Sequence, residues 1–149
     1  MNEDEVIKII IGHLRGLFPK DCTNCQRRFN SLADFFANTE PMGNPVLRDF
    51  EAGDRLPEKP LGAVALSSCG CGATVALTSE SMPLFQYWSV LLWVRSETRR
   101  RSVSVTVLLN RLRVEIRERV LAEEAARVES LQVMPIEGPP RWRKDAGAP

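Results

Sequence analysis

The 149-residue chain is poor in several features that would point directly to a function. It has one histidine, His13, and a formal net charge of only +1. Near-neutrality argues against a globally polybasic binder of nucleic acid or membrane. With one histidine and no assembled nucleophile, base and acid, a hydrolytic triad is unsupported, and His13 is expected to be an ordinary helix residue. The sequence therefore predicts a protein that is not an enzyme.

Long apolar runs are missing as well. The most apolar stretch, residues 82–94, contains Pro83, Gln86 and Ser89 and is shorter than the roughly 20 residues of a membrane-spanning helix. Acidic residues occupy positions 3–5, where a secretory signal would carry basic ones. We therefore expect a cytoplasmic protein without membrane association. In that reducing compartment, cysteines favour metal binding or redox chemistry over structural disulfides.

The four cysteines of the chain fall into two close pairs. One pair is a Cys-x-x-Cys, and the other is a Cys-x-Cys followed by Gly72, which can adopt positive φ and turn amides toward sulfur. Proteins usually supply tetrahedral zinc with two such pairs from separate elements. Reduced core cysteines, a redox-active pair and an iron–sulfur cluster stay open as alternatives. The pattern predicts one structural Zn²⁺ ion per chain, with the ligands Cys22, Cys25, Cys69 and Cys71.

Residues 21–72, which contain both pairs, resemble zinc-ribbon and zinc-knuckle proteins. In those proteins a Cys-x-x-Cys and a second cysteine pair on hairpin tips share one ion. The resemblance implies zinc knuckles and a site built from four thiolates. Here the second pair is Cys-x-Cys, and the two pairs are separated by a long segment that includes a predicted helix.

The spacing of apolar residues predicts an α+β fold, in which a short β-hairpin with zinc knuckles packs on a mainly helical body of about four helices. The hairpin strands are expected at 63–67 and 74–78. A short strand at residues 7–11 is an alternative to the first helix. Apolar periodicity and start signals place the helices at 3–18, 26–38, 84–94 (opened by Ser81 and Pro83) and 102–128.

The same pattern predicts one zinc-binding α+β domain over residues 1–134. Four prolines and two glycines between Thr39 and Pro60 indicate a long surface loop, 39–60, whose ends the cysteine pairs would clamp. The helix at 84–94 is apolar on nearly every side and is expected at the centre of the core. Residues 135–149 contain no periodic apolar pattern and are expected to form a disordered tail.

A basic segment runs from Arg95 to Arg119, with eight arginines and three glutamates, a local net charge of +5. It favours either a salt-bridged surface or a nucleic-acid contact. An apolar stripe on the last helix suits either the core or the seam of a homodimer. The contact residues for a partner or nucleic acid would be Arg95, Arg99, Arg100 and Arg101, and the stripe contains Leu109, Leu112, Ile116 and Val120.

These observations rank three functions. The first is a non-catalytic zinc-binding regulator or adaptor that contacts another protein, with a redox-sensing or metal-sensing role as one form of it. The second is a nucleic-acid-binding transcriptional regulator that uses the Arg95–Arg119 segment. The third is a thiol–disulfide oxidoreductase, in which a helix N-terminus would lower the pKa of Cys22.

Overall fold

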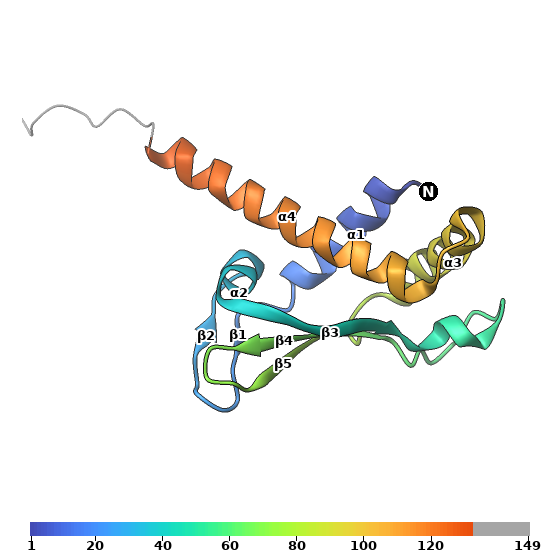
Figure 1. Cartoon of the computed structure of the whole chain (residues 1–149), viewed down its shortest axis with the longest axis horizontal. Coiled ribbons are helices and arrows are strands. Elements are labelled where there is room, and N and C mark those ends of the chain that lie inside the picture. The colour runs from blue at the N-terminus through green and yellow to red at the C-terminus, as the bar shows by residue number, and fades with distance from the viewer. Residues whose placement is uncertain (133–149) are drawn as a thin grey trace, which may run out of the picture.

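The computed structural model describes residues 1–132, which form helices and two small antiparallel sheets (Figure 1). This mixture confirms the predicted α+β class. No helix among these residues is both long and apolar enough to cross a bilayer. The predicted tail, 135–149, lies outside the described residues. In chain order the elements are α1 (Glu3–Arg15), β1 (Lys20–Asp21), β2 (Arg28–Phe29), α2 (Leu32–Asn38), β3 (Thr39–Leu47), the 3₁₀ turn η1 (Arg48–Ala52), β4 (Ala63–Cys69), β5 (Thr74–Thr78), α3 (Leu84–Arg101) and α4 (Val105–Gln132).

The larger sheet has the order β3-β4-β5, and β4 with β5 forms the predicted hairpin. The prediction of a loop over 39–60 is wrong for its first nine residues, because Thr39–Leu47 is a strand. Its prolines, Pro41 and Pro45, are tolerated because β3 lies at the sheet edge, where one side of the strand needs no ladder hydrogen bonds. The pairing with β4 is irregular between Met42 and Val46.

The second helix is shorter than its apolar spacing predicted. It starts at Leu32, not near residue 26, and the Ser31 hydroxyl caps it by accepting from the Asp34 amide at 3.1 Å. Phe29, which seemed to belong to the helical stripe, lies in β2. Its ring packs edge-on against Phe35 with 5.2 Å between centroids. Phe29 thus falls at helical spacing from the apolar residues of α2, but it lies in a strand and reaches the core by packing on Phe35.

The core lies between the larger sheet and the helices α1, α3 and α4. Of these helices, α4 crosses over the sheet (Figure 1). Leu112, Ile116 and Val120 of α4 are at most 6% exposed, and Leu109 packs against the same cluster. Of the two alternatives for the apolar stripe of α4, the structure supports the core, and the dimer seam is wrong for Leu112, Ile116 and Val120, which are buried within their own chain.

Helix α3 is less central than predicted. Leu91 and Val94 are fully buried, but Phe85 is 78% exposed and Leu92 is 48% exposed. The helix also runs seven residues beyond Val94 to Arg101, and it ends at Ser102, which adopts the left-handed conformation. The apolar run 84–94 thus supplies only one face of a surface helix.

Candidate metal centre

The four cysteine thiols meet where the β1–β2 hairpin lies beside the turn between β4 and β5 (Figure 1). The Sγ atoms of Cys22 and Cys71 are 3.7 Å apart, as are those of Cys25 and Cys69. All four Sγ atoms lie within 4.8 Å of one another. Zinc–sulfur bonds of about 2.3 Å in a tetrahedron separate sulfurs by roughly 3.8 Å. The predicted convergence is confirmed, and the spacing suits a single metal ion.

The first pair is held by a tight turn between β1 and β2. The Cys22 amide donates to the Arg27 carbonyl at 2.8 Å, and the Gln26 amide donates to the Cys22 carbonyl at 3.0 Å. Gln26 has φ of 65°, a left-handed conformation that reverses the chain directly after Cys25. The turn directs the amides of Asn24 and Cys25 toward the sulfur of Cys22.

The second pair sits on the tip of the β4–β5 hairpin. Gly72 has φ of 90°, which side chains rarely adopt, so glycine is required directly after Cys71. The Gly72 amide donates to the Cys69 carbonyl, and the Cys69 amide donates to the Ala73 carbonyl, both at 2.8 Å. The Ala73 amide faces the Cys71 sulfur. Both turns therefore place amide donors around thiolates, as the predicted knuckles require.

The environments of the thiols differ. The sulfur of Cys71 accepts from the Asn24 side-chain amide at 3.4 Å, and this bond together with the Ala73 amide lowers the pKa of Cys71 to about 6. Amides of Cys25 and Asn24 likewise lower the pKa of Cys22. Sequence analysis did not identify Asn24 as part of the site. Its position between two paired cysteines could have indicated that its side-chain amide donates to a sulfur.

Cys25 behaves in the opposite way. The Arg27 amide favours its thiolate, but desolvation and the neighbouring thiols of Cys71, Cys22 and Cys69 outweigh that bond and raise the pKa of Cys25 to about 11. Crowding therefore opposes the simultaneous ionisation of all four groups. A divalent cation would remove this opposition, since metal binding deprotonates cysteine ligands.

Burial divides the four cysteines into an inner and an outer pair. Cys22 and Cys69 are at most 3% exposed and belong to the core cluster, whereas Cys25 and Cys71 are exposed. An ion held by all four would thus be anchored to the core on one side and lie near the surface on the other. His13 is not part of this group, and its Nε2 donates to the Thr78 carbonyl at 2.8 Å, as expected for an ordinary helix residue.

Comparison of the chain with protein-family models, curated proteins and solved structures yields no match. The assignment of the cysteine site therefore rests on its own geometry.

The predicted arginine contacts have a different role. Arg95 is only 4% exposed, and its guanidinium donates to the carbonyls of Asp49 at 2.8 Å and Arg55 at 2.9 Å. The prediction of a partner contact at Arg95 is wrong, because the loop after β3 covers it. Arg99 is exposed and pairs with Asp54 at 2.6 Å.

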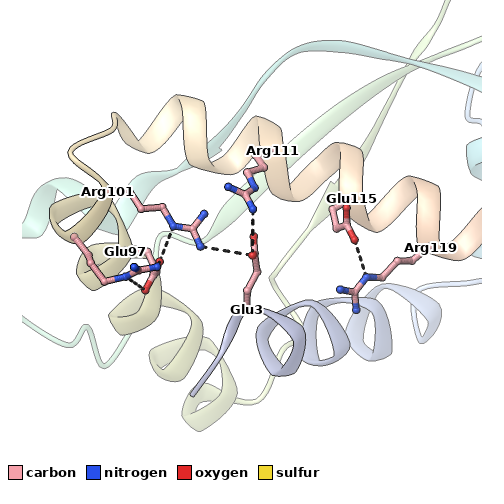
Figure 2. A network of polar contacts seen from close by, with 7 residues as sticks. Glu3, Glu97, Arg101, Arg111, Glu115 and Arg119 are labelled. Carbon is pink, nitrogen blue, oxygen red and sulfur yellow. Dashed lines mark hydrogen bonds and ion pairs between the residues drawn. The ribbon is translucent and has the colours of Figure 1, made fainter.

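Several other arginines of the segment form ion pairs that connect α1, α3 and α4 (Figure 2). Arg100 and Arg101 of α3 both bind Glu97, at 2.7 Å each. Arg101 also lies 3.5 Å from the carboxylate of Glu3 in α1. Arg111 of α4 lies 3.4 Å from the same carboxylate. Every arginine from Arg95 to Arg119 has a partner within the chain. This geometry favours the salt-bridged surface over a nucleic-acid contact.

Proposed function

We propose that this chain is a non-catalytic zinc-binding protein, with one Zn²⁺ held by Cys22, Cys25, Cys69 and Cys71, which acts as a regulatory or adaptor module in contact with another protein. The observation that carries the proposal is the near-tetrahedral separation of the four sulfur atoms, 3.7 Å in two of the pairs. Zn²⁺ is almost always tetrahedral in structural sites and binds four thiolates without redox change.

The spacing also argues against two of the alternative sulfur chemistries. A disulfide needs sulfurs about 2.05 Å apart, much closer than these. An iron–sulfur cluster inserts several iron and sulfide atoms between its cysteines, so it requires a wider arrangement than one that closes around a single ion. The geometry therefore supports one tetrahedral ion.

The closure of the site supports a non-catalytic role for the ion, which is compatible with a regulatory or adaptor function. Four protein ligands leave no coordination position for a substrate, which is the arrangement of structural zinc. Such an ion would make the two turns one rigid surface, and Thr23, Asn24 and Gly70 are exposed on it. A rigid exposed surface suits recognition of another protein.

A redox-responsive form of this function is supported by the exposure of Cys25 and Cys71. A peroxide could oxidise these two thiols to a disulfide: two electrons pass to the peroxide, its O–O bond breaks, and water forms with the protons released. Loss of two ligands would release zinc. Peroxide-dependent zinc release, measured with a chromogenic chelator, tests this form, and retention of zinc in oxidised protein would contradict it.

Metal analysis of untagged protein by mass spectrometry tests the site. We expect one zinc per chain, lost in Cys69→Ser and retained in the neighbouring control Ser68→Ala. Iron with equimolar acid-labile sulfide, or a folded chain that binds no metal, would overturn the proposal. Disulfide reductase turnover would favour the oxidoreductase instead, and steeply salt-dependent nucleic-acid binding would favour the transcriptional regulator.

A further inference from the structure

A partly open apolar cavity lies between the larger sheet and helices α1, α3 and α4, away from the cysteines. Its volume is about 160 Å³. Its walls are mostly aliphatic, and they include Ile10, Ala65, Leu77, Val90 and Ile116. An apolar cavity of about 150 Å³ is large enough to bind benzene. The body of this protein thus has room for a small apolar group.

Two arginines of α4, Arg113 and Arg117, line the same cavity and are half-buried. Among residues 1–132 neither has a carboxylate within 4 Å, whereas Arg111 and Arg119 on the same helix both form ion pairs. Half-buried cations without an acidic partner are costly, and burial lowers the pKa of Arg113 below its usual range. The cavity therefore combines nearly wholly apolar walls with two lining arginines that have no acidic partner among the described residues.

Both guanidinium groups are already oriented by backbone carbonyls. Arg113 donates to Gly43 at 2.8 Å and to the side chain of Asn110 at 2.8 Å. Arg117 donates to Phe36 at 3.0 Å, its one hydrogen bond within the described part of the chain. A guanidinium carries five N–H donors, so Arg117 in particular retains donors for a further acceptor. A guanidinium group that is held in one orientation and has unused N–H donors is well suited to bind a planar anion such as a carboxylate.

We propose that this cavity binds a small monocarboxylate with an apolar body of about six to eight carbons. The carboxylate would accept hydrogen bonds from Arg117 and Arg113, and the apolar body would lie between the sheet and α4. Sites of this kind combine apolar walls with a few placed polar groups, and charge-assisted bonds from arginine to carboxylate supply orientation. This inference is independent of the zinc site, because none of the cysteines lines the cavity.

Calorimetric titration of the full chain with octanoate tests the proposal, with 1-octanol as a probe of the same body without charge. We expect saturable 1:1 binding of octanoate, and binding of 1-octanol weaker by about tenfold or more, since one charge-assisted bond amounts to at least a factor of ten. Chemical shifts in the NMR spectrum should change for residues of the cavity wall. Absence of binding, or equal affinity for the alcohol, would overturn the proposal.

Three variants locate the site. Ala65→Leu adds three carbons to the cavity wall and should strongly weaken octanoate binding. Arg117→Gln should weaken octanoate about tenfold or more and leave the affinity for 1-octanol unchanged, a pattern that a merely misfolded variant would not produce. Arg111→Gln, on the same helix outside the cavity, should bind octanoate as the parent does. Undiminished octanoate binding by Ala65→Leu would place the ligand elsewhere and refute the inference.

Discussion

The two ends of this molecule are built on different physical principles. The cysteine module, residues 20–29 and 69–74, contains strands of only two residues, and its buried side chains are those of Cys22, Phe29 and Cys69. The body, formed by the larger sheet with α1, α3 and α4, buries aliphatic side chains from each of these helices. Short hairpins are marginal in water, so the module would depend on the proposed metal ion, whereas apolar burial stabilises the body.

Removal of the proposed metal ion should have the largest effect, and it should act on the cysteine module alone. Apparent binding energies of structural zinc are about 10–16 kcal/mol, so chelation should unfold the module while the body persists. Hydrogen exchange after chelator treatment should show lost protection at Cys22 and Cys69 and retained protection along α4. A uniform loss over the whole chain would mean that the two ends unfold as one unit.

The complementary experiment weakens the body. Leu112 is 2% exposed, and Leu112→Ala should cost about 2–5 kcal/mol of unfolding free energy because it leaves a cavity in the core. Val114, two residues away and 56% exposed, is the matched control, and Val114→Ala should cost less than about 0.5 kcal/mol. Urea denaturation measures both. Similar losses for the two variants would contradict the assignment of this helix face to the core.

A smaller loss of unfolding free energy is expected from substitution of Asp49, a buried carboxylate that forms hydrogen bonds to the loop after β3. Its oxygens accept from the amides of Leu61 at 3.1 Å and Gly62 at 2.9 Å and from the Tyr87 hydroxyl. Asp49→Asn replaces one acceptor with a donor, and it should cost about 1–3 kcal/mol at neutral pH.

The pH dependence of the stability of Asp49→Asn shows whether the negative charge of Asp49 or only the shape of its side chain stabilises the fold. Desolvation disfavours the Asp49 carboxylate, but the bonds from Tyr87, Gly62 and Leu61 outweigh it and hold its pKa below the usual 3.8. A carboxyl whose pKa is depressed on folding stabilises the protein above 3.8 and loses that contribution as pH falls through the folded value. The deficit of Asp49→Asn should therefore shrink below about pH 4. Denaturation curves at neutral and acidic pH measure it, and a constant deficit would show that the charge is immaterial.

The sequence was informative where the chemistry of a residue restricts its surroundings. Two cysteine pairs and Gly72 identified the cluster and the hairpin turn, since few local structures bring paired thiols together beside a glycine of positive φ. Apolar periodicity also located α1 and α4, with shifts at their ends.

The sequence misled where tertiary context decides. Prolines in β3 suggested a loop, because nothing local reveals that a strand will lie at an edge. Arg95 looked exposed because its partners are the carbonyls of Asp49 and Arg55, which lie 46 and 40 residues upstream in the chain. Such contacts leave no periodic signal, and the cavity beside Arg113 leaves none either.

The arginines of α4 have one more consequence. Strand β3 is an edge, and unpaired edges invite strands of other molecules to add to the sheet. Arg113 donates to the carbonyls of Met42 and Gly43 from the helix that crosses this strand. Because Arg113 already pairs with these two carbonyls, that part of the β3 edge offers fewer free acceptors to a strand of another molecule.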